Sequence, residues 1–238
     1  MEQTQKTLSI IIPVYNEENT ITELLNLVEK VELRGIKKEI IIIDDCSTDG
    51  TKEILEKLKG KYKILFREKN EGKGSVIRLG FLLSKGDFTI VQDADLEYDP
   101  EEYINLLQPL IDDRADVVYG SRFISNKPHR VLYFWHYLGN RFLTLFSNIF
   151  TNLNLSDMET CYKIFNRSAL DKIKNKLTSK RFGIEPEITA LVARNNLRIY
   201  EIGISYHGRT YQEGKKIGWK DGFSAIWSII KYNLIKRN

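Results

Sequence analysis

The chain has 238 residues, of which 42% are hydrophobic and 29% are charged, a composition that allows a sizeable core and indicates one ordinary globular domain. No apolar run reaches about 18 residues and the N-terminus is polar, so we expect neither a membrane-spanning helix nor a signal peptide, and we expect a cytosolic protein. Cys46 and Cys161 are the only cysteines and form no C-x-x-C motif, which predicts reduced thiols rather than a disulfide framework.

The charge is divided unevenly along the chain. The net charge is +4, but residues 1–121 contain 16 Lys and Arg against 24 Asp and Glu, whereas residues 122–238 contain 20 against 8. A basic half is expected to meet an anionic partner, and nucleic acid, an anionic membrane surface or a phosphorylated substrate would each satisfy it. A solvated basic face without a partner is the alternative. We treat the change near residue 121 as internal to one domain.

The acidic half alternates short apolar strands with amphipathic helices. The pattern predicts strands at 8–14, 39–44, 62–68, 88–93 and 116–121, separated by helices at 21–35, 47–58, 72–86 and 99–113. Apolar strands that alternate with helices indicate a mostly parallel sheet covered on both faces. Ligands of such sheets gather at the carboxyl ends of the strands.

Two common nucleotide-binding motifs are absent from these strand ends. The first strand is followed by "VYNEEN", which contains no glycine, and no G-x-x-x-x-G-K-[ST] motif occurs anywhere. These absences weigh against a dinucleotide-dependent oxidoreductase and a P-loop ATPase. Gly72, Lys73 and Gly74 follow the third strand and open a helix, where they could bind an anion or simply form a tight turn.

Acidic residues are concentrated in "DADLEYDP", after the fourth strand. Asp99 precedes Pro100 and is explained as a helix N-cap. Asp93 and Asp95 lie at alternate positions at the strand end, where carboxylates can converge on a divalent cation such as Mg²⁺ or Mn²⁺ that also holds substrate phosphates. His129, His136 and His207 are scattered, so zinc chemistry is not expected.

Two amphipathic helices are expected in the basic half, at 131–153 and 223–238. Both combine aromatic and aliphatic residues at helical spacing with nearby Lys or Arg, which fits helices that lie at a membrane surface. Packing against the core or against a second subunit is the alternative for each helix. The glycine-spaced basic segment 208–222 is predicted to be a loop that closes over the substrates, with Lys215 and Lys216 contributing charge.

Four strand-end segments, "SIIIPVYNEENTI", "EIIIIDDCSTDGT", "NEGKGSVIRLGF" and "DADLEYDP", together resemble family 2 glycosyltransferases of the GT-A fold. The continuation through "DVVYGSRF", "SDMETCYKIFNR" and "EIGISYHGRTYQEGKK" is similar to the branch that contains dolichol-phosphate mannose synthases and polyprenyl-phosphate glucosyltransferases. The resemblance covers nearly the whole chain. It implies a GT-A fold, that is, a Rossmann-like, mostly parallel sheet flanked by helices, with the C-terminal amphipathic helices added to it.

The resemblance also implies roles for individual residues. Asp93 and Asp95 would hold a divalent metal, Mg²⁺ or Mn²⁺, on the donor diphosphate, with Glu97 where a third ligand is found. Arg122 and Arg209 would meet the acceptor phosphate, and Asp157 falls where related glucosyltransferases have a catalytic acid. Nucleotide-sugar contacts are implied for Pro13, Tyr15, Glu17, Asp44, Asp45, Lys73, Asp93 and Lys215.

The chemistry of sugar transfer gives independent reasons for some of these roles. A departing nucleoside diphosphate concentrates charge on its oxygens, and a metal beside Asp93 and Asp95 would neutralise that charge. A phosphate acceptor is already anionic near neutral pH and needs mainly placement, which arginines such as Arg122 and Arg209 provide. Asp157 could orient a donor hydroxyl or a cationic neighbour, act as a base towards an alcohol, or cap a helix.

We therefore expect an enzyme, an inverting hexosyltransferase of family 2, that moves a hexose from a GDP-mannose or UDP-glucose type of donor to a polyprenyl or dolichyl phosphate. Inversion is expected because one direct displacement needs no enzyme nucleophile. The expected location is peripheral, at the cytosolic membrane face, with a homo-oligomer left open and nucleic acid excluded as a partner. The alternatives are a family 2 enzyme with a saccharide or protein hydroxyl acceptor, and a non-catalytic nucleotide-sugar-binding protein.

Overall fold

The computed structural model describes residues 5–124, 130–131, 133–210 and 219–235. The described elements, in chain order, are β1 Thr7–Val14, α1 Ile21–Lys30, β2 Lys37–Asp44, α2 Thr51–Glu56, β3 Lys63–Phe66, α3 Lys73–Leu83, β4 Phe88–Val91, η1 Pro100–Glu102, α4 Tyr103–Ile111, β5 Val117–Ser121, α5 Phe134–Thr151, β6 Lys163–Asn166, α6 Arg167–Ile173, α7 Ile184–Arg194, β7 Ile199–Gly203, α8 Trp219–Ile230 and η2 Lys231–Ile235.

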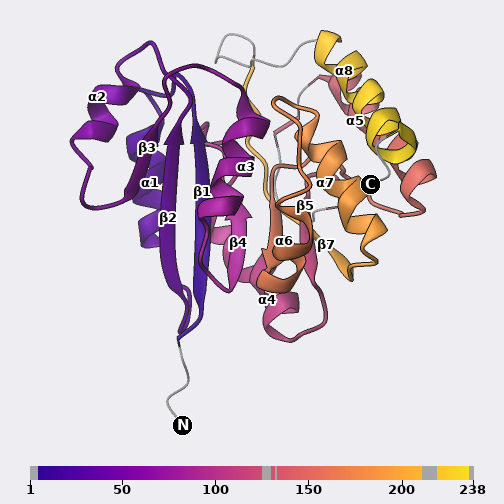
Figure 1. Cartoon of the computed structure of the whole chain (residues 1–238), viewed down its shortest axis with the longest axis horizontal. Helices are drawn as coiled ribbons and strands as arrows, with labels where there is room; N and C mark the ends of the chain where they lie inside the picture. Colours follow the sequence, from indigo (N-terminus) through magenta and orange to yellow (C-terminus); the bar gives the residue numbers. More distant parts are fainter. Residues whose placement is uncertain (1–4, 125–129, 132, 211–218, 236–238) are drawn as a thin grey trace.

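One seven-stranded sheet organises the molecule, in the order β3-β2-β1-β4-β6-β5-β7. All neighbouring strands are parallel except β6, which runs antiparallel to both β4 and β5. Strands from the acidic and the basic halves therefore share one sheet. In Figure 1 the strands are spread across the view from β3 to β7, with the N-terminus at the lower end and the carboxyl ends of the parallel strands at the upper end. This confirms the expected mostly parallel α/β architecture.

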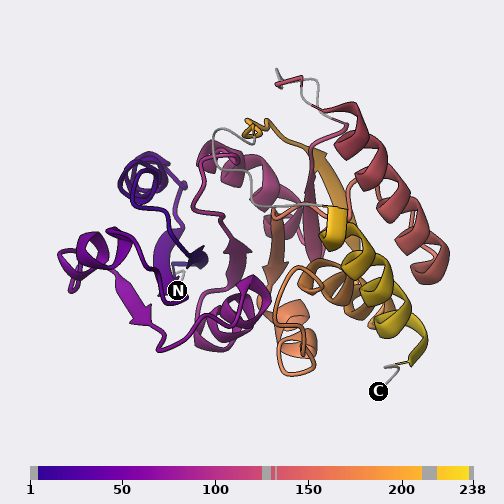
Figure 2. The ribbon, with the colours of Figure 1, turned by 90° about the horizontal axis from the view of Figure 1, so that it is seen from above.

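The strands are apolar along their length because helices cover both faces of the sheet. Figure 2 shows α1 and α4 on one face and α3, α6 and α7 on the other. β4 and β5 are buried at every residue, and Ile10, Ile11 and Ile12 of β1 are fully buried. Each helix contributes its apolar side to this core, as Ile21, Leu24, Leu25 and Val28 of α1 illustrate. The predicted periodicity of residues 21–28 is thus confirmed.

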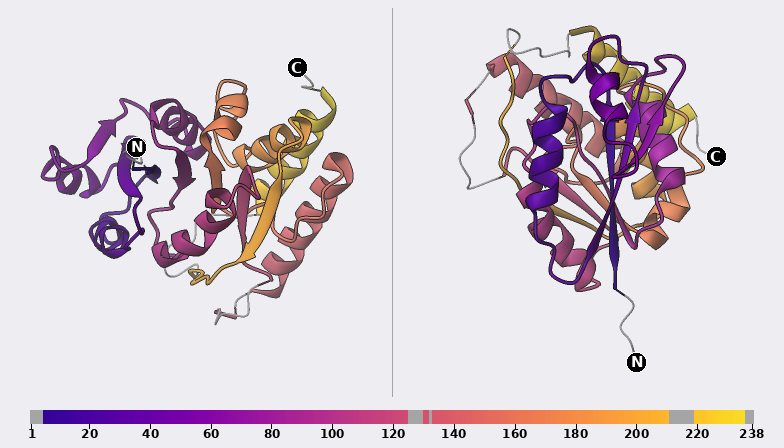
Figure 3. Two further views of the ribbon diagram at one scale, coloured as in Figure 1. Left: turned by 90° about the horizontal axis from the view of Figure 1, so that it is seen from below. Right: turned by 90° about the vertical axis from the view of Figure 1, so that its left-hand side faces the viewer.

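Helices α5 and α8 form an outer layer beyond α7. They pack against each other and against α7, on the side of the molecule away from β3 (Figures 1 and 3). Their outward sides are apolar: Trp135 is 76% exposed on α5, and Trp227 is 57% exposed on α8. Leu143, Phe146 and Phe150 of α5 pack against the core instead. Both predicted amphipathic helices are confirmed, and each contributes to the core as well as to the surface.

The structure corrects or extends several expectations. Helix α8 begins at Trp219, so the last four residues of the predicted loop 208–222 are helical, while Lys215 and Lys216 lie outside the described residues. The short strands β6 and β7 and helices α6 and α7 were not predicted. Asp99 caps η1 as expected, since its carboxylate accepts the Glu101 N–H at 2.9 Å. Within the described ranges, no helix is both long and apolar enough to cross a bilayer.

Candidate active site

The two predicted metal-binding carboxylates lie just beyond the carboxyl end of β4, each beside a cation. Asp93 Oδ1 lies 2.6 Å from Nζ of Lys73, the first residue of α3. Asp95 Oδ2 lies 3.2 Å from Nη2 of Arg209, which follows β7. Because parallel strands end at one edge of the sheet, three segments distant in sequence converge here. The structure thus brings together Lys73, Asp93, Asp95 and Arg209, and it pairs Arg209, which was expected at the acceptor phosphate, with a carboxylate expected to hold the metal.

Arg209 is surrounded by carboxylates from two strand ends. Besides Asp95, it lies 3.7 Å from Glu17 and 3.7 Å from Glu97 through its guanidinium nitrogens. Its backbone N–H donates to Glu97 Oε1 at 2.8 Å, and the Tyr206 hydroxyl donates to Glu97 Oε2 at 2.7 Å. The chain's own arginine therefore neutralises the acidic groups at this edge.

The predicted three-carboxylate metal set is not assembled. Among the described residues, no group of three or more His, Cys, Asp and Glu side chains is placed to hold a metal ion. Asp93 and Asp95 remain a pair at the end of β4, whereas the Glu97 side chain is engaged by Tyr206 and Arg209. Glu97 does not join the pair because its carboxylate accepts hydrogen bonds from the segment after β7 and so holds that segment against the site.

Burial and charge shift the pKa values of these groups in opposite ways. Burial of the Asp95 carboxyl, together with the Asp93 and Glu97 carboxylates, raises its pKa to about 7. Burial alone would lower the pKa of Lys73, but the Asp93 carboxylate outweighs this effect and the pKa is raised above its ordinary value. Lys73 therefore stays protonated at neutral pH, while the buried Asp95 carboxyl holds its proton more readily than an exposed aspartate does.

A second charged centre lies at the end of β5. Arg122 makes a bidentate ion pair with Asp157, with Nε and Nη2 each 2.7 Å from a carboxylate oxygen, and its backbone N–H donates to the same carboxylate at 3.0 Å. The side chain of Asp157 is fully buried and that of Arg122 is 12% exposed. Glu201 of β7 holds the turn by accepting the Ser156 and Asp157 N–H groups.

This pairing bears on the roles considered for Asp157. Its carboxylate orients a cationic neighbour, Arg122. No helix begins at Asp157, so the helix-cap interpretation is wrong. Arg122 also lies over the Tyr206 ring, with its guanidinium carbon 5.3 Å from the ring centre. Arg122 therefore places a positive charge at the end of β5, with its Nε and Nη2 atoms already hydrogen-bonded to Asp157.

Asp44 and Asp45, at the end of β2, organise the loops around them. Asp45 accepts the backbone N–H groups of Glu71 and Gly72 at 3.1 and 2.7 Å. Gly72 has a φ of +92°, and a Cβ there would lie 2.7 Å from the Lys180 carbonyl oxygen, so the turn requires glycine. Asp44 accepts hydrogen bonds from the Ser47 hydroxyl and N–H. Asp45 thus fixes the turn that leads to Lys73, and Asp44 fixes the turn after β2.

The remaining predicted donor contacts lie around the end of β1. Pro13 is in β1, Tyr15 follows it and is 38% exposed, and the Glu17 carboxylate accepts the Thr20 hydroxyl at 2.8 Å. The Glu17 N–H donates to Thr51 Oγ1 at 2.9 Å, which joins this loop to α2. These residues border the same edge of the sheet as Asp44 and Asp93.

Sequence reasoning missed a third buried pair at this edge. Lys163, the first residue of β6, contacts Glu185 in the first turn of α7, and both residues are buried. Glu159 and Cys161 lie in the segment just before β6. A strand of only four residues is too short to show the alternation of polar and apolar residues that predicts strands, so β6 was not recognised. Only the antiparallel placement of β6 brings the segment before it to the carboxyl edge of the sheet.

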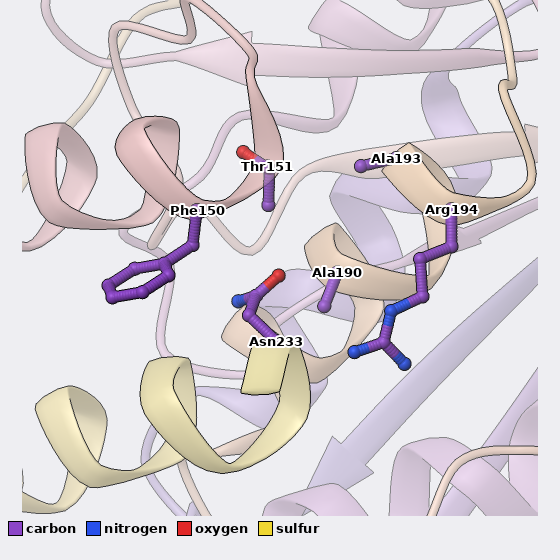
Figure 4. A pocket seen from close by; sticks show the side chains of 6 residues that line it. All are labelled: Phe150, Thr151, Ala190, Ala193, Arg194 and Asn233. Carbon is purple, nitrogen blue, oxygen red and sulfur yellow. The ribbon is translucent and has the colours of Figure 1, made fainter. Parts of the chain in front are cut away.

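A cavity of about 480 Å³ lies elsewhere in the molecule. It is lined by Phe150, Thr151, Ala190, Ala193, Arg194 and Asn233, where the C-terminal ends of α5 and α7 meet η2 (Figure 4). None of the predicted site residues lines it. The cavity is therefore separate from the predicted site at the carboxyl edge of the sheet.

The combination of a carboxylate pair after β4 and a cationic strand end after β5 agrees with a family comparison. Residues 9–174 match the model of glycosyl transferase family 2. The chain belongs to this family. The glycosyltransferase match spans β1 to the start of the segment after α6, so it includes every strand end described above except that of β7.

Named relatives of this glycosyltransferase include several enzymes of lipid-linked sugar synthesis. The chain is 24% identical to a UDP-N-acetylglucosamine--dolichyl-phosphate N-acetylglucosaminyltransferase of Methanococcus voltae, over 97% of the chain and 98% of that protein. It is 32% identical to the dolichyl-phosphate beta-glucosyltransferase of Saccharomyces cerevisiae, over 84% of the chain and 66% of that enzyme. It is 37% identical to a dolichol-phosphate mannosyltransferase of Pyrococcus furiosus, over 50% of the chain and only 34% of that enzyme's length.

Solved structures support the fold independently. A glucosyl-3-phosphoglycerate synthase of Mycobacterium tuberculosis, crystallised with Mn²⁺, UDP and glucosyl-3-phosphoglycerate, superposes with a TM-score of 0.72 over 96% of this chain and 80% of its own. The sequence identity is 17%, so the similarity establishes the GT-A fold. The chain is thus a glycosyltransferase with the fold expected from its sequence.

Proposed function

We propose that the protein transfers a hexose from a nucleotide-diphosphate sugar to a polyprenyl or dolichyl phosphate, with inversion at the anomeric carbon. The observation that carries the proposal is the convergence of Asp93, Asp95 and Lys73 with Arg122 and Arg209 at one edge of the sheet. One centre suits a donor diphosphate, and the other suits an anionic acceptor. The dolichyl-phosphate enzymes among the relatives support the acceptor class.

The donor set at β4 fits a divalent metal. Asp93 and Asp95 offer oxygen ligands, and burial together with the Asp93 and Glu97 carboxylates raises the pKa of Asp95, an effect that a bound cation would oppose. Mg²⁺ and Mn²⁺ are commonly held by one or two carboxylates together with substrate phosphates, so a third protein carboxylate is not needed. Bound there, Mg²⁺ or Mn²⁺ supplies neutralisation of the charge on the departing diphosphate. Lys73, fixed beside Asp93, adds positive charge to the same region.

The acceptor needs placement more than activation. In the proposed displacement, an acceptor phosphate oxygen forms a bond to the anomeric carbon while the bond to the donor diphosphate breaks, and the nucleoside diphosphate leaves. A phosphomonoester is largely ionised near neutral pH, so no general base is required. Asp157 is committed to Arg122, which favours a phosphate acceptor over a hydroxyl that would need Asp157 as its base.

The apolar outer sides of α5 and α8 are proposed to contact the membrane surface that holds the lipid acceptor. The two helices are adjacent and expose Phe134, Trp135, Phe223 and Trp227 in a half of the chain that is strongly basic. Aromatic side chains beside basic residues suit the interface of an anionic bilayer.

Transfer to lipid tests the proposed function. Purified protein is incubated with Mn²⁺ or Mg²⁺, polyprenyl phosphate and one radiolabelled donor at a time, chosen from UDP-glucose, UDP-N-acetylglucosamine and GDP-mannose. We expect label in the organic phase with one donor, and loss of at least about 100-fold in Asp95→Ala, because one electrostatic contribution to the transition state is typically that large. Asp116→Asn, at the opposite edge of the sheet, is the matched control. Label that reaches only water or a soluble saccharide would refute the lipid acceptor.

A further inference from the structure

Glu159 lies in the segment that joins the two charged centres of the site. The segment begins at Asp157, which holds Arg122 at the end of β5, and reaches Cys161, whose thiol donates to the Val91 carbonyl at the end of β4 over 3.7 Å. Because β6 is antiparallel, with Lys163 opposite Tyr119, the residues before it lie at the carboxyl edge of β4 and β5. Glu159 is the midpoint of this bridge.

One carboxylate oxygen of Glu159 is buried without a hydrogen-bond partner. Oε1 has none among the described residues, although the residue as a whole is partly exposed. A buried polar atom without a partner costs about 1–3 kcal/mol, and native structures contain few of them. The Thr160 hydroxyl is also unpaired within the described ranges, but no part of the Thr160 side chain reaches the surface. Glu159 is the residue on this bridge that combines an unpaired carboxylate oxygen with a partly exposed side chain.

The charges around Glu159 restrict what that ligand can be. The carboxylates of Glu185 and Asp157 lie near it, and the nearby cations Lys163 and Arg122 are each engaged by one of those carboxylates. Burial and the Glu185 carboxylate raise the pKa of Glu159 to about 7. An anion would be repelled, and the described residues offer no group of three metal ligands. A neutral hydrogen-bond donor such as a hydroxyl remains.

We propose that Glu159 accepts a hydrogen bond from a hydroxyl group of the transferred hexose and so helps to select the donor sugar. In a direct displacement the hexose must lie between the donor diphosphate and the acceptor phosphate, and the bridge from Cys161 to Asp157 spans that interval. This inference rests on the proposed function, since it requires a nucleotide-sugar donor. It concerns binding of the sugar and requires no chemical step by Glu159.

Calorimetric titration of the whole protein with a nucleotide sugar and with the matching nucleoside diphosphate, in the presence of Mg²⁺, tests the inference. In Glu159→Ala we expect affinity for the nucleotide sugar to fall about 10- to 100-fold, the range for a hydrogen bond to a charged group, while affinity for the nucleoside diphosphate is unchanged. Glu159→Gln keeps an acceptor oxygen and should restore part of the affinity. Asp116→Asn, a carboxylate at the far edge of the sheet, should match the wild type.

Donors that lack single sugar hydroxyls provide a test that does not depend on a folded variant. Wild-type protein should lose affinity for one deoxy donor by about the factor seen for Glu159→Ala with the parent donor, and the variant should not discriminate between the two. Equal loss for nucleotide sugar and nucleoside diphosphate, or unchanged affinity for every deoxy donor, would overturn the inference. If wild-type protein binds nucleotide sugars but transfers none to lipid, the proposed function fails and the role of Glu159 in sugar binding stands. If it binds no nucleotide sugar, both fail.

Discussion

At the residue scale, the main result is that Arg122 and Asp157 form one buried ion pair. Two nitrogens of the Arg122 guanidinium each donate a hydrogen bond of 2.7 Å to a carboxylate oxygen of Asp157. Either charge buried alone in this region would lower the stability of the fold. Removing one member of such a pair leaves the other charge buried and uncompensated. The pair therefore ties the stability of the fold to the geometry of the proposed acceptor site.

Asp157→Asn is expected to lower the free energy of unfolding by about 3–5 kcal/mol, because it leaves the Arg122 guanidinium buried without its carboxylate. Urea denaturation followed by circular dichroism measures the change. The double variant Arg122→Met/Asp157→Asn should recover a large part of that loss, since no isolated charge remains. A double variant that is less stable than Asp157→Asn would show that the pair contributes through packing instead.

Glu159 gives a prediction about pH. Its pKa is about 7 in the folded chain and about 4.5 in the unfolded chain, with Glu185, Asp157, Lys163 and Arg122 as the charged neighbours. Between these two values the unfolded chain releases its proton before the folded chain does, so the wild type loses stability as the pH rises. Glu159→Gln cannot titrate at this position. The variant should therefore gain about 1–3 kcal/mol relative to wild type between pH 4.5 and 7.

Denaturant titrations of both proteins across this pH range test the prediction. A constant difference between them would show that Glu159 titrates normally. Glu29→Gln is the control. It changes a carboxylate of α1 that pairs with Lys61, far from the site, and should show no such gain in stability.

At the scale of elements, α5 and α8 pack against the rest of the protein on one side and expose aromatic residues on the other. Leu143, Phe146 and Phe150 fasten α5 to the core, while Trp135 and Trp227 point outward from the paired helices. Because the two sets lie on different sides of the helices, the outward residues can be changed with little effect on the core.

Trp135→Gln combined with Trp227→Gln should reduce binding to vesicles of phosphatidylcholine mixed with anionic phosphatidylglycerol by about 10-fold or more, with thermal stability nearly unchanged. Vesicle sedimentation measures the binding. Leu82→Gln, which alters an equally exposed apolar residue on α3, should bind as the wild type does. If the tryptophan variant instead changes the molecular mass in light scattering, the face is an interface between two copies of the chain, and membrane contact must be withdrawn.

At the scale of the whole molecule, the acidic and basic halves meet within one sheet. β6 is contributed by the basic half and lies between β4 and β5, so neither half has a complete set of strand neighbours by itself. The carboxyl ends of β4 and β5 are separated by the start of β6, so the segment that contains Glu159 runs between the two charged centres at those ends.

This arrangement predicts that the chain unfolds as one cooperative unit. Amide hydrogens of Ile10, Ile90, Val118 and Ile164, all fully buried in four different strands, should exchange with the same free energy, equal to that of global unfolding. Native-state hydrogen exchange in low denaturant measures these values. A lower common value for Val118 and Ile164 than for Ile10 would instead show two independently unfolding halves.

The sequence by itself determined the alternation of strands and helices as far as β5 and predicted a site at their carboxyl ends. These features follow from short-range periodicity and from the rule that parallel strands end together. The cationic roles of Arg122 and Arg209 were expected from the resemblance to family 2 glycosyltransferases. Only the tertiary structure decided that β6 inserts antiparallel between β4 and β5, that Asp157 is committed to Arg122, that Glu97 fastens the segment carrying Arg209, and that Glu159 lies between the two centres. Each of these features consists of contacts between residues at least 35 positions apart, or depends on such contacts. Local sequence patterns carry no information about which distant residues meet.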